Sequence, residues 1–164
     1  MNITIRQATE LDQPAILRIY NYEVMHNTAT FDTQERTLPA QQVWFAAHGQ
    51  RHPVLVAVHH GEVLGWASLS PWSERKAYDH SCELSVYIDV PYRGKGIGQL
   101  LMKSILEAGK IANMRTIISK ITSENEGSIH IHQKFGFIHV GELKAVGEKF
   151  DRILDVTIMQ LILK

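Results

Sequence analysis

The stretch from Cys82 to Ser104 most constrains the fold, because it joins a strand pattern to a helix pattern through three closely spaced glycines. Apolar residues first alternate as in a half-buried strand: Leu84, Val86, Ile88 and Val90. After Pro91 and Tyr92, apolar residues follow helical spacing: Ile97, Leu100, Leu101, Ile105 and Leu106. The residues between, from Arg93 to Gly98, must therefore turn the chain from a strand into a helix.

This glycine-rich turn has the composition of an anion site. Glycines let the backbone approach a ligand closely, and the first turn of a helix carries N–H groups without intrahelical partners. Arg93 and Lys95 add positive charge. The spacing matches neither the P-loop pattern G-x-x-x-x-G-K-[ST] nor the dinucleotide pattern G-x-G-x-x-G. A turn that only joins a strand to a helix remains the alternative.

Composition and charge restrict the classes of partner. The chain has 164 residues, which predicts a single domain over 1–164. Seventeen Lys and Arg residues balance 17 Asp and Glu residues, so there is no electrostatic case for binding nucleic acid or a membrane. A single cysteine, Cys82, excludes an internal disulfide and is typical of a reducing, cytoplasmic compartment. We find neither a signal peptide pattern nor an apolar run of membrane-spanning length.

The order of patterns along the chain predicts an α/β (α+β) fold. Strands are expected near 3–5, 53–57, 62–69, 82–90, 115–121, 137–143 and 155–163. Helices are expected near 11–25, 37–49, 97–112 and 125–134. The helix after the central strand implies a parallel pair of strands, whereas the hairpins imply antiparallel pairs. We therefore predict a mixed sheet of about seven strands with helices on both faces.

Two motifs in this chain resemble those of the Gcn5-related N-acetyltransferases (GNAT). The first is Arg-x-x-Gly-x-Gly at Arg93–Gly98, and the second is Asn-x-x-Ser-x-x-x-His-x-x-x-Gly-Phe at Asn125–Phe137. The resemblance implies the GNAT fold, acetyl-CoA as co-substrate and a bulged central strand whose N–H groups polarise the thioester carbonyl. The cofactor-binding residues that it implies are Val86, Tyr87, Ile88, Arg93, Gly94, Lys95, Gly96, Ile97, Gly98, Asn125 and Ser128.

Most of that family carries tyrosine at the step where this chain has His132. In this histidine the chain resembles the phosphinothricin and methionine sulfoximine or sulfone acetyltransferases. The resemblance extends to four further stretches: Pro71–Asp79, Glu83–Tyr87, Gly147–Phe150 and Leu154–Val156. This resemblance implies a homodimer that acetylates an amino-acid-like amine. The substrate-binding residues considered are Phe31, Trp72, Arg75, Tyr78 and Lys149.

Acetyl transfer requires a neutral amine, so a base must remove a proton from the ammonium. We assign Glu83 as the base, acting through water, and His132 as the proton-transfer partner, although these roles are interchangeable at this point. Arg75 can grip a carboxylate bidentately, and Trp72 and Tyr78 can form an amphipathic wall. For each of these residues, an ordinary surface or half-buried structural role is the alternative.

The nine histidines do not predict a metal site. His59 and His60 lie at a hairpin tip, and His130 and His132 lie about 200° apart on a helix, so neither pair makes a chelate. Other functions stay open from the sequence alone. They are acetylation of a protein N-terminus, of a lysine or of an aminoglycoside, and a CoA-binding sensor without turnover.

Overall fold

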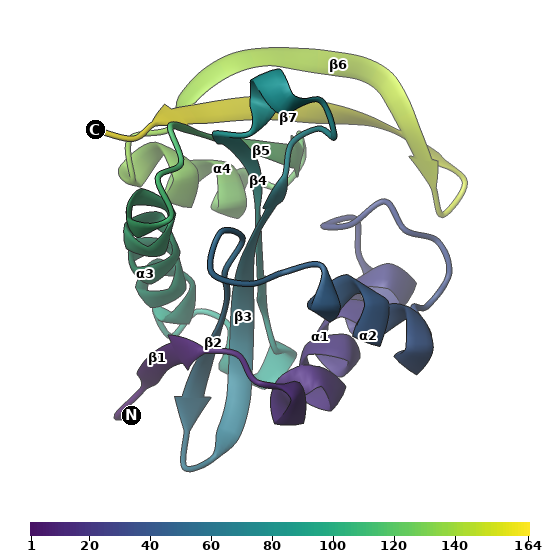
Figure 1. Cartoon of the computed structure of the whole chain (residues 1–164). Coiled ribbons are helices and arrows are strands. Elements are labelled where there is room, and N and C mark those ends of the chain that lie inside the picture. The colour runs from purple at the N-terminus through teal and green to yellow at the C-terminus, as the bar shows by residue number, and fades with distance from the viewer.

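The computed structural model describes residues 1–164 as one seven-stranded sheet with helices on both faces (Figure 1). The strands are β1 Thr4–Gln7, β2 Val54–His59, β3 Glu62–Pro71, β4 Ser81–Ile88, β5 Thr116–Thr122, β6 Ile138–Lys149 and β7 Arg152–Ile162. The main helices are α1 Gln13–His26, α2 Leu38–Ala46, α3 Ile97–Ile111 and α4 Glu126–Lys134. None of these helices is long and apolar enough to cross a membrane.

The strands lie in the order β1-β2-β3-β4-β5-β7-β6. Every neighbouring pair is antiparallel except β4 and β5, which are parallel and are joined through α3. The predicted mixed sheet, the order of its elements and the parallel pair are therefore confirmed.

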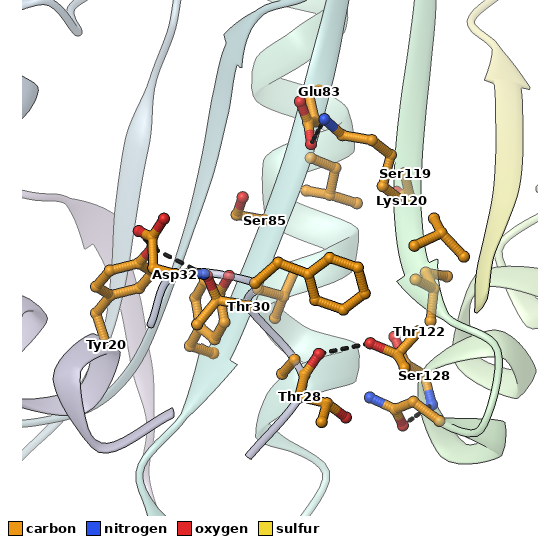
Figure 2. A pocket seen from close by; sticks show the side chains of 18 of the residues that line it. Tyr20, Thr28, Thr30, Asp32, Glu83, Ser85, Ser119, Lys120, Thr122 and Ser128 are labelled. Carbon is orange, nitrogen blue, oxygen red and sulfur yellow. Dashed lines mark hydrogen bonds and ion pairs between the residues drawn. The ribbon is translucent and has the colours of Figure 1, made fainter. Parts of the chain in front are cut away.

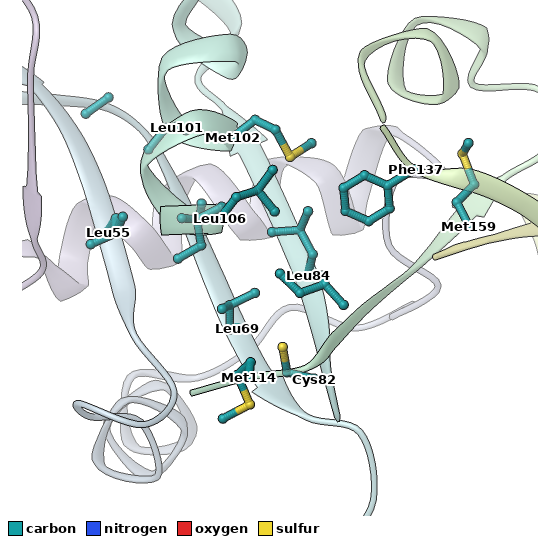
Figure 3. Packing of buried hydrophobic residues seen from close by; sticks show 14 of the residues in the cluster. Leu55, Leu69, Cys82, Leu84, Leu101, Met102, Leu106, Met114, Phe137 and Met159 are labelled. Carbon is teal, nitrogen blue, oxygen red and sulfur yellow. The ribbon is translucent and has the colours of Figure 1, made fainter. Parts of the chain in front are cut away.

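A separate apolar core lies on each face of the sheet. Along β2, Leu55 and Ala57 face the core beneath α3, whereas Val54 and Val56 face the core beneath α1. This division follows from the alternation of side chains along a strand. Figure 3 shows Leu101, Met102 and Leu106 of α3 packed over the first core. Cys82 is buried in the same core, and burial raises the pKa of its thiol to about 12, which leaves it unreactive.

The C-terminal hairpin is longer than the sequence predicts. β6 continues to Lys149 and β7 begins at Arg152, with Phe150 and Asp151 in the left-handed region at φ 52° and 55°. The register of β6 against β7 shifts twice, and Ala145 also has a positive φ. These irregularities interrupt the alternation of apolar and polar residues, so a period-two pattern does not extend to the end of the strand.

The feature that positions the site is an early end to pairing between β4 and β5. The two strands pair only from Ser81 to Glu83 against Thr116 to Ile118. Beyond these positions β4 pairs only with β3, and β5 pairs only with β7. The sheet therefore splits between its two central strands.

The predicted bulge in the central strand is wrong. β4 pairs with β3 in unbroken register from Cys82 to Ile88, and the shift in this half of the sheet lies at Ala57 and Val58. Asp89 N–H donates to Leu64 O at 2.9 Å, so alternation along β4 leaves the N–H groups of Val86 and Ile88 facing the split. The free amides expected on this strand thus arise from the separation of β5 and not from a bulge.

Candidate active site

A cavity of about 480 Å³ occupies the split in the sheet. Residues 83–87 of β4 and 119–122 of β5 form its two sides. The loop 28–32 after α1 crosses one opening, and Asn125, Ser128 and His132 reach it from the α4 side. Figure 2 shows Glu83 and Lys120 meeting at one end of this gap, and Thr28 linked to Thr122 near the other. Its lining includes Leu84 and Ile121 of the core beneath α3 and Tyr20 and Trp66 of the core beneath α1, so the cavity passes between the two faces of the sheet.

Glu83 lines the cavity and is paired with a lysine. Its carboxylate lies 3.2 Å from Lys120 Nζ on the opposite strand, and 29% of the Glu83 side chain is exposed. A carboxylate with this access to water is placed to accept a proton through a water molecule. The structure thus brings the predicted base to the cavity, together with a cation that sequence reasoning did not select.

His132 lies on the other side of the gap and is buried. Its Nδ1 lies 2.7 Å from Ser128 O, and its Nε2 lies 2.9 Å from Ser119 Oγ. Because a carbonyl only accepts, Nδ1 carries the proton and Nε2 accepts from the Ser119 hydroxyl. Burial lowers the pKa of His132, so the neutral form is favoured. His132 therefore faces the reacting space through Ser119, which itself lines the cavity.

The buried histidine makes stability depend on pH. Because the pKa of His132 is lowered by folding, the unfolded chain takes up a proton near pH 6.5 that the folded protein resists. We expect the free energy of unfolding to be constant above that pH and to fall below it, by up to about 1.4 kcal/mol per pH unit for this group. His48, whose pKa is also lowered by burial, adds to the slope. Urea unfolding at pH 5.5 and 7.5 measures the effect.

The variant His132→Gln should show a smaller pH slope than the wild type. His130→Gln is the matched control, since His130 lies on the same helix but is exposed. Equal slopes for the wild type and His132→Gln would contradict the assignment of a neutral, buried imidazole.

The glycine-rich turn has the backbone geometry of an anion cradle. Gly94 and Gly96 have positive φ of 73° and 80°, and Gly96 is the N-cap of α3. The N–H groups from Gly94 to Gly98 make no hydrogen bond within the chain. No atom lies within 4 Å of a Cβ built on Gly94 or Gly96, so the space above them is open. A phosphate fits the chemistry of this site.

The sequence predicts that Arg93 adds positive charge to that cradle, but its side chain points elsewhere. It pairs with the buried carboxylate of Glu23 and donates from Nε to Ile88 O at 3.1 Å. Arg93 thereby ties the turn to α1 and to the end of β4. Lys95 lies 5.2 Å from the Tyr92 ring and remains exposed beside the turn.

The second motif lies next to the first. Asn125 Oδ1 accepts from Ser128 N–H at 3.1 Å and caps α4, and both residues line the cavity. A Cβ on Gly98 would lie 3.8 Å from Ile131 of α4. The anion cradle and the α4 side of the cavity are therefore neighbours, as a long ligand with a phosphate group requires.

The predicted substrate residues divide into two groups. Phe31 lines the cavity, and Trp72 lies near its edge, with its ring 5.8 Å from Lys120 Nζ. Arg75 and Tyr78 lie in the exposed loop between β3 and β4 and do not line the cavity. The aromatic wall is formed mainly by Tyr20, Trp44 and Trp66, which sequence reasoning did not select, together with Tyr87, which the sequence assigned to the cofactor.

The prediction that Lys149 binds the substrate needs correction. Lys149 is only 4% exposed, and its Nζ donates to Asn27 O at 2.6 Å, Thr30 O at 2.8 Å and Glu23 O at 3.3 Å. Gly147, two residues earlier on β6, also packs against this loop, since any side chain there would collide with the Phe31 ring. Lys149 is therefore a positioning residue for the loop that borders the cavity.

Removing this ammonium should destabilise the protein. Lys149→Met keeps the apolar stem but leaves three backbone carbonyls without their charged donor, so we expect a loss of about 3 kcal/mol in the free energy of unfolding. Lys144→Met on the same strand is the control, because Lys144 makes only exposed ion pairs and should cost under about 1 kcal/mol. Urea denaturation of both variants tests this. Equal losses would contradict the role of Lys149.

The chain is similar to known acetyltransferases over almost its whole length. Residues 16–137 match the acetyltransferase (GNAT) family. The methionine sulfoximine/methionine sulfone acetyltransferase of Pseudomonas paraeruginosa is 39% identical over 163 residues, covering 98% of this chain and 95% of that protein. The phosphinothricin N-acetyltransferase of Streptomyces coelicolor is 34% identical over 158 residues, covering 94% and 92%. The structure of yncA from Salmonella typhimurium, solved with its cofactor acetyl-CoA, has a TM-score of 0.97 at 33% identity, covering 100% of this chain and 95% of that one.

Proposed function

Because this chain belongs to the acetyltransferase (GNAT) family, we propose that its cavity transfers the acetyl group of acetyl-CoA to the amine of an amino-acid-like small molecule. Methionine sulfone, methionine sulfoximine and phosphinothricin are the substrates we favour, since similar enzymes are named for them. The observation that carries the proposal is the split in the sheet, which places Glu83 on one side of a cavity and the Ser119–His132 pair on the other. We also propose that residues 1–164 form one catalytic domain.

The anion cradle and the α4 side of the cavity suit acetyl-CoA, which supplies an activated acetyl thioester when bound. The free N–H groups from Gly94 to Gly98 would hold its pyrophosphate, with Lys95 as the nearby cation. Asn125 and Ser128 would contact the pantetheine arm. The N–H groups of Val86 and Ile88, free on the edge of β4, would polarise the acetyl carbonyl.

Two protons must leave the substrate nitrogen when an ammonium becomes an amide. We assign the first to Glu83, which accepts it through water and passes it to solvent. We assign the second to the Ser119–His132 pair: the Ser119 oxygen would take it while the Ser119 proton moves to His132 Nε2. The imidazolium would then return a proton through Ser119 to the departing thiolate, which leaves as the thiol. The neutral state of His132 supports this route, because its unprotonated Nε2 accepts a hydrogen bond from the Ser119 hydroxyl and can take that proton.

We also propose that the enzyme is a cytoplasmic homodimer. Several apolar side chains on β6 and β7 are more than half exposed: Ile138, Val140, Val146, Ile153 and Ile162. A second copy of the chain would cover this surface. The single free thiol, Cys82, is compatible with a reducing compartment.

The test is thiol release from acetyl-CoA with methionine sulfone, methionine sulfoximine, phosphinothricin, an aminoglycoside and a peptide panel as acceptors. Saturable turnover on one of the first three is expected. Turnover on peptides or the aminoglycoside alone would overturn the proposed substrate class but keep the reaction. Binding of acetyl-CoA without turnover on any acceptor would favour a sensor.

A further inference from the structure

We propose that Arg36 receives the carboxylate of the amine substrate. The inference deepens the proposed function, since it rests on an amino-acid-like substrate in the same cavity. Arg36 lies in the segment between α1 and α2 and lines the cavity. No motif in the sequence selects it, and the role it would play is the one the sequence predicts for Arg75.

The backbone of Arg36 is held firmly. Its N–H donates to Asn21 Oδ1 at 2.8 Å, and its carbonyl accepts from Asn21 Nδ2 at 2.9 Å. The next residue, Thr37, caps α2 by accepting from Ala40 N–H. A side chain on a segment fixed in this way pays little entropy on binding a ligand.

The guanidinium is also oriented before any ligand binds. Its Cζ lies 4.2 Å from the centroid of the Tyr20 ring and 5.2 Å from that of Trp44. Nη1 donates to Gln41 Oε1 at 2.9 Å, and Gln41 is fully buried on α2. Nε and Nη2 make no hydrogen bond within the protein. One part of the guanidinium is therefore fixed by the protein while other donors remain available to an oxyanion.

Arg36 is the cation lining the cavity that makes no ion pair. Lys120 is paired with Glu83, and Asp32 accepts a hydrogen bond from the Tyr20 hydroxyl. No carboxylate oxygen lies within 4 Å of the Arg36 guanidinium. A half-buried arginine without a partner, stacked on aromatic rings, is suited to a bidentate carboxylate. A sulfone oxygen carries no net charge and would gain less from it.

The experiment compares a substrate that has the carboxylate with one that lacks it. We would measure kcat/KM for methionine sulfone and for methionine sulfone amide with the wild type, Arg36→Gln, Arg36→Lys and Arg75→Gln. Arg36→Gln should lower kcat/KM about 100-fold for the acid and less than about threefold for the amide. Arg36→Lys, which keeps the charge but not the fork, should lose about tenfold on the acid only. It also keeps the test decisive if Arg36→Gln does not fold.

Equal losses on the acid and the amide would show that Arg36 only supports the aromatic wall, and would overturn the inference. A selective loss in Arg75→Gln but not in the Arg36 variants would overturn it too, and would return the role to Arg75. Absence of turnover by the wild type on methionine sulfone, methionine sulfoximine and phosphinothricin alike would overturn the proposed function, and this inference with it. If the wild type turned over substrate but the Arg36 variants lost equal activity on the acid and the amide, only this inference would fall and the proposed function would stand.

Discussion

Glu83→Gln is expected to lower kcat for the favoured amine by about 100- to 1000-fold, while the KM for acetyl-CoA changes less than about twofold. Glutamine preserves the size of the side chain and a hydrogen-bond acceptor, but at neutral pH it cannot take the proton of the ammonium. Because the free amine fraction rises with pH, the variant should recover part of its rate at alkaline pH. Steady-state thiol release at pH 7 and 9 measures both effects.

The chain offers a matched control in Glu142→Gln. Glu142 is paired with Lys144 at 3.0 Å and its side chain is 31% exposed, close to the 3.2 Å and 29% of Glu83, but it lies outside the cavity. The Glu142→Gln variant should therefore keep the kcat of the wild type. If Glu83→Gln retained more than half of the activity while Ser119→Ala removed it, the base would be the Ser119–His132 pair, and our assignment of the two proton transfers would have to be exchanged.

Gly96→Val is expected to raise the KM for acetyl-CoA about 100-fold, which corresponds to about 2.7 kcal/mol of binding free energy. A valine at φ 80° strains the turn, and its side chain fills the open space above the free N–H groups. Loss of two charge-assisted hydrogen bonds accounts for an effect of this size. Acetyl-CoA saturation curves at a fixed amine concentration provide the measurement.

Gly61→Val separates strain from binding. Gly61, at the tip of the β2–β3 hairpin, also has φ 80° and also has no atom within 4 Å of an added Cβ. Both variants should therefore lose similar free energy of unfolding, about 1–2 kcal/mol. Only Gly96→Val should change the KM for acetyl-CoA. A similar change of KM in Gly61→Val would mean that the defect is one of general stability.

Local pattern was sufficient to predict the order of elements in this protein. Alternation from Leu84 to Ile88, glycine spacing and the helical run after Ile97 are properties of consecutive residues, and the structure agrees with them. The split between β4 and β5 is different. It depends on where two strands, about 35 positions apart in the chain, stop pairing, and neither strand carries a local signal for that point.

The partners of the cationic side chains also could not be predicted from local sequence pattern. Arg93 lies in a motif that suggests phosphate binding, yet a carboxylate 70 positions away in the chain takes its side chain. Lys149 is satisfied by the carbonyl of Asn27, which is 122 positions away. Ser119 could have been recognised only after His132 was known to be buried beside it. Which charges remain free in the cavity is thus a property of the fold and not of the motif.

The split sheet also has a consequence for the cohesion of the molecule. Within the sheet, three paired positions join β4 to β5, and the amides farther along the inner edge of β4 are left without strand partners. Outside the sheet, the core beneath α3 and the Lys149 contacts hold the two parts together. A ligand that accepts hydrogen bonds from that edge takes the place of the missing strand neighbour. Bound co-substrate would then bridge the gap between β4 and β5, and we expect the free energy of unfolding to rise with its concentration.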